Sequence, residues 1–483
     1  MKQNEKGLGA WQLTMMALGS VIGGSFFLGS AVAIHATGPS VVLAFAFGGV
    51  LVYFILQALS EMTVANTSAG SFRAFAAQAF GDGAGFVVGW VYWTGMVLAM
   101  SSEATAVSIL FRTWVPNLSV WLVGSAVILC VTLINLLGAN LLSKLESSLA
   151  FVKVFAVVFF ILLALSLITG LFTSTPAIGL GALAKEPLFT GGWKSLLGSM
   201  LIVMFTYAGF EIIGLASSEA RAPKENIPKA IRYTVVSLVS LYILSNAVLL
   251  PLIPTADIGE EISPLVAALN LHGIGWAGAA INVVLITAIL STMLAAMFGV
   301  GRMIGSLAKD KLAPSWLKDK HMVPYRGILF SGISMLSALW FGMLFPSVYL
   351  FLISAGGFSI LFAYVMIMAT HIRFRRKKLI FLDGKRQKND FPYTSLLTLL
   401  ALLAVIMGMP FVAGQETGMF AGGAILSFFA TTYLVMLLYQ RNHKRQLYHV
   451  IQGSRLQPEF SKELGETVPN QKKKVFDNDQ SPK

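Results

Sequence analysis

Two short segments place glycine and polar residues inside otherwise apolar runs. Residues 19–25 hold three glycines and two serines, and residues 205–211 place Gly209 close to the carboxylate of Glu211. Glycine costs a helix about 1 kcal/mol relative to alanine, so such a cluster allows the helix to unwind. An unwound helix exposes backbone N–H and C=O groups that can bind a carboxylate and an ammonium group. Taken alone, each segment is more often a site of close helix packing.

Three ionisable residues lie within apolar runs, where each costs a few kcal/mol and therefore requires a reason. Lys153 lies near the end of its run, so its side chain could snorkel to the membrane surface, or its ammonium could act in transport. Glu103 could pair with a cationic substrate side chain or line a wet outer vestibule. Glu211 could carry a proton or accept N–H bonds from an unwound backbone. The sequence leaves these alternatives open.

The elements that must position these residues are membrane helices. Hydrophobic residues make up 56% of the chain and charged residues 12%, which is too little polar material to cover a soluble globule. A bilayer core requires about 20 apolar residues per helix. We count twelve such runs, at residues 10–34, 39–59, 83–111, 120–137, 148–171, 195–218, 233–254, 274–300, 327–345, 348–370, 393–414 and 419–439. The sequence predicts an all-α integral membrane protein with about twelve transmembrane helices.

The basic residues fix the expected orientation. The chain carries 35 Lys and Arg against 22 Asp and Glu, but the outer loops hold only Arg112, Lys185 and Lys194. The positive-inside rule then places both termini in the cytoplasm and the protein in the cell membrane, and it removes nucleic acid as the reason for the positive charge. We expect residues 1–9 to form a cytoplasmic N-terminus and residues 440–483 a disordered cytoplasmic tail.

The first and sixth runs, which contain the two glycine segments, are five helices apart. The chain therefore enters the membrane in opposite directions at the two segments. This spacing divides the chain into two inverted halves, residues 10–172 and 195–370, followed by two further helices within 393–439. Many secondary carriers have this layout, with broken helices binding substrate at the middle of the membrane. An α-amino acid presents the carboxylate and the ammonium that such a site would bind.

Three motifs resemble those of amino acid permeases in the amino acid, polyamine and organocation (APC) superfamily. They are ALGSVIGGSFFLGS at 17–30, FTYAGFEIIGLASSEARAPKENIPKAI at 205–231 and GRMIGSLAKDKLAP at 301–314, with a weaker SPLV at 263–266. The likeness covers roughly residues 8–440. It implies a LeuT-type fold of five plus five inverted helices with two more at the C-terminal end, and with helices 1 and 6 broken.

The resemblance also implies roles for individual residues. The substrate carboxylate would bind at the loop formed by Ser20, Ile22, Gly23, Gly24 and Ser25; Phe205 would close over the substrate, and Ala208 and Gly209 would lie at its ammonium. Lys153 would occupy the cation position of sodium-coupled relatives, near Ser291 and Thr292, which points to proton coupling or exchange. Two departures concern substrate identity: Ser25 replaces the last glycine of the usual Gly-x-Gly, and Leu294 and Ala295 replace polar residues of the eighth helix.

These observations favour proton-coupled symport of amino acids without ATP, since no Gly-rich phosphate loop is present. Amino acid or amine exchange and non-translocating sensing of amino acids are the alternatives. The six histidines show no ligand spacing, so we expect no metal site and no cofactor, and no cluster near a span end indicates an enzyme. One cysteine, Cys130, excludes an intramolecular disulfide. The sequence gives no indication of the oligomeric state.

Overall fold

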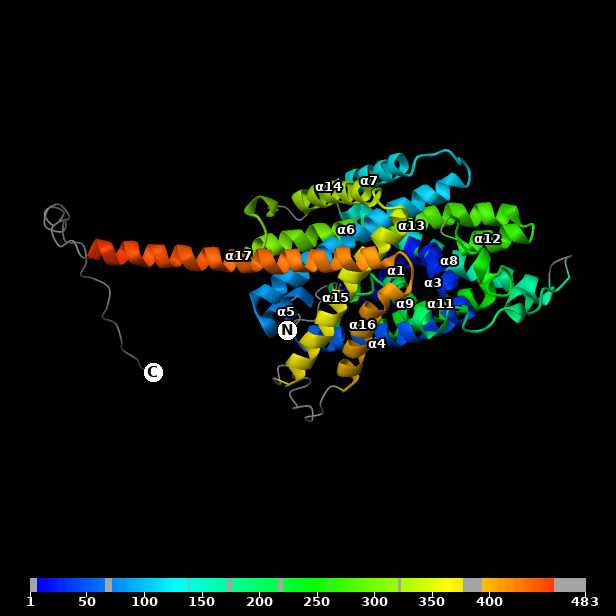
Figure 1. Ribbon diagram of the computed structural model, residues 1–483, viewed down its shortest axis with the longest axis horizontal. Coiled ribbons are helices and arrows are strands. Elements are labelled where there is room, and N and C mark those ends of the chain that lie inside the picture. The colour runs from blue at the N-terminus through cyan, green and yellow to red at the C-terminus, as the bar shows by residue number, and fades with distance from the viewer. Residues whose placement is uncertain are drawn as a thin grey trace, which may run out of the picture. The chain divides into compact units, whose positions relative to one another are not determined.

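The computed structural model describes residues 7–65, 72–137, 139–171, 176–215, 220–259, 261–319, 323–376 and 393–455. Every regular element in these ranges is a helix, apart from one isolated bridge between Leu8 and Ala220 (Figure 1). The α-helices are α1 (Ala10–Val21), α2 (Gly24–Phe27), α3 (Gly29–Thr37), α4 (Val41–Ala65), α5 (Phe72–Phe80), α6 (Asp82–Arg112), α7 (Val120–Leu136), α8 (Ala139–Thr169), α9 (Gly192–Thr206), α10 (Ile212–Leu215), α11 (Pro223–Leu249), α12 (Pro264–Leu271), α13 (Gly275–Lys309), α14 (Tyr325–Gly342), α15 (Val348–Arg376), α16 (Tyr393–Gly408) and α17 (Gln415–Arg455). Short 3-10 helices include η1 (Gly38–Ser40), η2 (Gly181–Lys185), η4 (Thr255–Asp257), η5 (Ser315–Leu317) and η6 (Met409–Phe411).

The helices are long and apolar enough for a membrane protein. Eight stretches of the described chain meet the length and composition of a membrane span, one of them the continuous run Gly24–Ala65. Two shorter apolar helices, α7 and α9, add to these. The protein is therefore an all-helical, multi-pass membrane protein, as the composition predicts.

The centre of the unit formed by residues up to Ala430 is the pair α6 and α15, which are mostly buried and pack along each other. Small residues make this close approach possible. A Cβ atom added to Gly95 of α6 would lie 2.8 Å from Cβ of Ser359 in α15, and one added to Gly356 would lie 3.2 Å from the backbone nitrogen of Ala99. Helices in a membrane associate through such small-residue contacts, because lipid tails are as apolar as the helix surface itself.

The outer surface of the same unit is apolar. Along α8, the exposed side chains include Phe151, Phe155 and Leu162, all more than half exposed. A soluble protein rarely leaves so continuous an apolar face in water, whereas lipid solvates it. α7 and α14 lie side by side along another part of the bundle (Figure 1). Cys130 is exposed on α7.

The expected disorder of the whole tail from residue 440 is wrong for its first part. α17 continues to Arg455, so residues 440–455 are helical. The segment holds three Gln and three Arg residues and no proline, so once the membrane helix has nucleated, continuation costs little. The chain from Thr431 onward forms a separate compact unit, and residues 456–483 lie outside the described ranges.

Candidate substrate and coupling site

The first glycine segment interrupts the helix that begins at Ala10. α1 ends at Val21, Ile22 and Gly23 have extended backbones, and α2 begins at Gly24. Leu28, whose backbone is right-handed helical, is the one residue between α2 and α3. The N–H groups of Gly24 and Ser25 therefore begin a nearly continuous helical run that reaches Thr37. This end of a helix carries partial positive charge.

The second glycine segment separates α9 from α10. α9 ends at Thr206 and α10 begins at Ile212, with turns between them. Gly209 has φ of +107°, a conformation that side chains rarely adopt. A Cβ atom there would also lie 2.7 Å from the carbonyl oxygen of Ser20.

The two interruptions touch each other. The hydroxyl of Ser20 donates to the carbonyl of Gly209 at 3.1 Å, although the residues are 189 positions apart in the chain. Ile22, which follows α1, and Phe205, in the last turn of α9, are both buried. Ala208 is partly exposed in the turn between α9 and α10. The structure thus brings the predicted carboxylate loop and the predicted ammonium side together in one partly buried region.

Glu103 of α6 points at the first interruption. Its Oε2 accepts the N–H of Gly24 at 2.7 Å, and its Oε1 accepts the N–H of Ser25 at 3.1 Å. The residue is only 7% exposed, so it does not line an open vestibule in this conformation. A carboxylate of the protein itself therefore accepts the N–H groups that the family resemblance assigns to a substrate carboxylate.

Lys153 of α8 is fully buried, which excludes the snorkelling alternative. Its ammonium donates to the carbonyl of Gly19 and, at 2.7 Å, to the hydroxyl of Thr292 in α13. The Thr292 hydroxyl in turn lies 3.1 Å from the carbonyl of Ile22. Lys153 therefore links α1, α8 and α13 at the carbonyl end of the first interruption.

Ser291 does not join this network. Its hydroxyl is buried and has no hydrogen-bond partner among the described residues. Adjacent residues of an α-helix point about 100° apart, so Ser291 and Thr292 cannot both face Lys153.

Glu211 lies at the second interruption and accepts three hydrogen bonds. Its Oε2 accepts the N–H of Gly209 at 3.0 Å and the hydroxyl of Tyr364 at 3.2 Å, and its Oε1 accepts the hydroxyl of Tyr92 at 2.7 Å. These contacts hold the turn against α6 and α15. They favour the bracing alternative for this carboxylate.

Comparison with known proteins identifies the family. A profile of the amino acid permease family matches residues 12–449. The chain belongs to this family. Its relatives include the amino-acid permease RocC of Bacillus subtilis, 31% identical over 89% of this chain and 94% of that protein. The gamma-aminobutyric acid permease of the same species is 30% identical over 90% of this chain and 95% of its own length. The aromatic amino acid transport protein AroP of Salmonella typhimurium is 32% identical over 86% of this chain and 92% of its own length.

Membership makes this chain an APC-superfamily amino acid permease, a membrane transporter in a family that is not one of enzymes. The names of the relatives refer to different cargoes, from gamma-aminobutyric acid to aromatic amino acids. Family membership therefore establishes amino acid transport as the class of activity.

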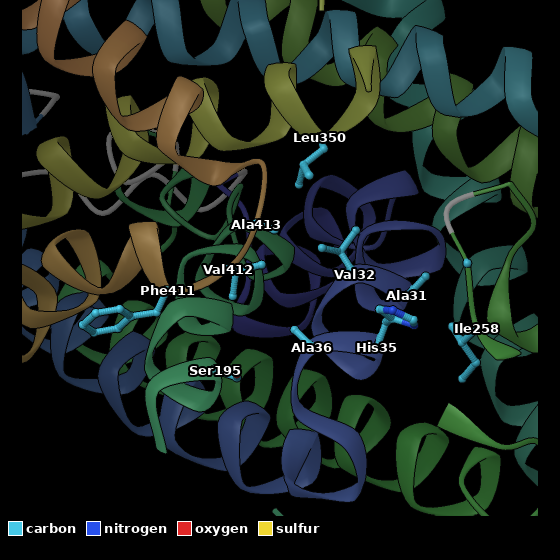
Figure 2. Close-up of a pocket in the computed structure, with 11 residues that line it drawn as sticks. Ala31, Val32, His35, Ala36, Ser195, Ile258, Leu350, Phe411, Val412 and Ala413 are labelled. Atoms are coloured by element: carbon cyan, nitrogen blue, oxygen red, sulfur yellow. The ribbon is translucent and has the colours of Figure 1, made fainter. Parts of the chain in front are cut away.

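The permease also has a cavity of about 420 Å³ away from the two interruptions. It lies at the ends of α3 and α9 that the expected orientation places outside, and Figure 2 shows His35 and Val32 of α3 facing Ile258, Leu350 and Val412 across it. None of the predicted substrate-binding residues lines this cavity. Among the described residues there is also no group of three His, Cys, Asp or Glu side chains that could hold a metal ion.

Several residues of the permease site carry no signal in the sequence. Tyr92 and Tyr364 lie in apolar runs without a motif, yet their hydroxyl groups complete the contacts of Glu211. Tyr349 of α15 is a further case, since its hydroxyl donates to the carbonyl of Gly24 at 3.3 Å. A buried tyrosine needs a partner for its hydroxyl, which is the one general hint that such residues give.

Proposed function

We propose that this permease carries α-amino acids across the cell membrane as a proton-coupled symporter, by alternating access. The observation that carries the proposal is the meeting of the two interrupted helices at Ser20 and Gly209, with the N–H groups of Gly24 and Ser25 following the first interruption. A zwitterion offers one carboxylate and one ammonium to such a pair. Phe205 would close over the bound substrate, and Ser20, Ile22, Gly23, Ala208 and Gly209 would supply the backbone around it.

Proton rather than sodium coupling is supported by Lys153. Its ammonium bonds to Gly19 of α1 and Thr292 of α13, at the position where backbone carbonyl groups would otherwise coordinate a bound cation. A covalently attached positive charge leaves no room for a second cation at that point. Glu103 would exchange protons with the two sides of the membrane, and Glu211 would brace the second interruption.

The architecture that we propose has twelve spans. Two inverted five-helix halves, residues 10–172 and 195–370, would rock against each other, and two further helices would follow within 393–439. Both termini would face the cytoplasm. This arrangement agrees with the family, with the broken helices five spans apart and with the sparse basic residues of the outer loops.

The test is uptake of a panel of radiolabelled L-amino acids into proteoliposomes without sodium, with and without an inward proton gradient. We expect at least one amino acid to accumulate, and its accumulation to rise with the gradient. Uptake that requires preloaded amino acid and ignores the gradient would instead establish exchange. Binding of an amino acid without any flux would establish a sensor.

A further inference from the structure

Glu103 and a substrate carboxylate compete for the same donors. Two backbone N–H groups, of Gly24 and Ser25, already each donate to one oxygen of Glu103, at 2.7 and 3.1 Å. Backbone N–H groups can only donate, so both oxygens of Glu103 act as acceptors there. One pair of N–H groups cannot bind two carboxylates in this geometry at once.

The contact is built for a carboxylate. A Cβ atom at position 24 would lie 2.6 Å from Oε2 of Glu103, so only glycine lets the carboxylate reach the backbone. The same Cβ position lies 3.1 Å from Ile289 and 3.2 Å from Ala106, which are apolar and exclude water. Glu103 itself is 7% exposed. Charge–charge interactions are strong in such a dry setting.

We propose that Glu103 is an internal carboxylate that fills the substrate-carboxylate site between transport events, and that an amino acid displaces it only as Glu103 takes up a proton. The inference rests on the proposed function and names its coupling step. One proton forms an O–H bond on Glu103 while the substrate carboxylate takes the N–H groups of Gly24 and Ser25. On release, the proton leaves and the Glu103 carboxylate returns to the same donors. The number of negative charges in the site is then constant through the cycle.

Neighbouring groups favour this exchange. The titratable and charged groups that interact with Glu103 are the ammonium of Lys153 from α8 and the phenol of Tyr242 from α11. The phenol of Tyr349 from α15 donates to the carbonyl of Gly24, whose N–H bonds to Glu103. From α13, Thr292 and Ile289 are uncharged. One ammonium offsets one carboxylate well but two poorly, so a second carboxylate enters at low cost only when Glu103 is neutral.

The proposal also predicts selectivity. A decarboxylated amine has no group that can replace the Glu103 carboxylate on the N–H groups, so it should bind far more weakly than its parent amino acid and without proton uptake. Specificity of this kind depends on unpaired donors that a wrong ligand would leave behind.

The test uses the full-length protein in detergent. All twenty L-amino acids are first screened for thermal stabilisation, and the strongest stabiliser serves as the probe. Its dissociation constant is then measured from pH 5 to 8 for the wild type, Glu103→Gln and Glu416→Gln. Glu416 is a matched control, because its carboxylate also accepts a backbone N–H, that of Gly414 at 3.0 Å, in an exposed outer segment.

We expect the wild type and Glu416→Gln to lose affinity as the pH rises, by up to about tenfold per pH unit for one linked proton. Glu103→Gln cannot ionise, so its affinity should be independent of pH and at least tenfold higher than that of the wild type at pH 8. A Glu103→Gln protein that keeps the wild-type pH slope would overturn the proposal. If no amino acid stabilises the wild type, the proposed function fails as well.

A second measurement needs no variant. The probe amino acid is added to the wild type in weakly buffered solution near pH 7.5 with an indicator dye. The protein should take up about one proton for each amino acid molecule that it binds. The protein should take up no proton when the corresponding decarboxylated amine is added. Binding of the amino acid without proton uptake would contradict the proposal even where Glu103→Gln does not fold.

Discussion

At the scale of single residues, Gly209 is a position in the candidate site that has no room for a side chain. Its φ of +107° strains any other residue, and an added Cβ would meet the Ser20 carbonyl at 2.7 Å. We expect Gly209→Ala to destabilise the protein by about 1–3 kcal/mol and to reduce amino acid uptake. The apparent melting temperature in detergent and the uptake rate measure the two effects.

The control for this variant is Gly299→Ala in α13. A Cβ atom at Gly299 has open space around it, so the substitution should leave the melting temperature unchanged or raise it slightly. Equal effects of the two substitutions would show that the contact between the interruptions is unimportant.

Glu211 is the residue for which proton transfer and bracing give different outcomes. Its three hydrogen bonds come from Gly209, Tyr92 and Tyr364, all parts of the wall around the second interruption. Glutamine keeps one acceptor oxygen, so we expect Glu211→Gln to transport more slowly with an unchanged dependence on pH. Uptake that no longer responds to the proton gradient, with normal binding of the amino acid, would make Glu211 a proton carrier instead.

At the scale of helices, Lys153 joins α8 to the interrupted α1 and to α13. Replacing it by methionine keeps the length of the side chain but leaves the Gly19 carbonyl and the Thr292 hydroxyl without the ammonium. A buried group that loses its partner costs about 1–3 kcal/mol. We expect Lys153→Met to lower proton-driven uptake at least tenfold and to flatten its dependence on pH.

Lys185→Met serves as the comparison, because Lys185 is an exposed lysine in η2 of an outer segment. Its uptake should equal that of the wild type. If Lys153→Met transports as well as Lys185→Met and with the same pH optimum, Lys153 has no part in coupling.

The helices also show what the sequence could predict. The interruption after Val21 follows from local composition, since glycine and serine weaken a helix where they cluster. The interruption after Thr206 contains the single Gly209, whose backbone has a positive φ. The hydrogen bond between Glu103 and Gly24 joins residues 79 positions apart, and the sequence around either residue gives no indication of the other. Ser291 and Thr292 were equivalent in sequence, and only the rotation of α13 about its axis selects Thr292. Local patterns thus predict elements, whereas packing decides which side chains meet.

At the scale of the whole molecule, the expected orientation follows from where the basic residues are few. The outer segments hold Lys185 and Lys194, whereas the end of α13 and the segment after it hold Lys309, Lys311 and Lys318. Cys130 is the single cysteine, so Cys130→Ala gives a background without thiols. Single cysteines introduced by Lys185→Cys and Lys318→Cys then report on opposite sides of the membrane.

In intact cells, a membrane-impermeant maleimide should label the Lys185→Cys protein and not the Lys318→Cys protein, which should react only after the membrane is permeabilised. The physical reason is that lysine and arginine are retained on the cytoplasmic side during insertion, so η2 must face outward if the loop after α13 faces inward. The reverse labelling pattern would invert the topology. Protons would then approach Glu103 from the opposite side, and the inward proton gradient could no longer drive the displacement of its carboxylate by an external amino acid.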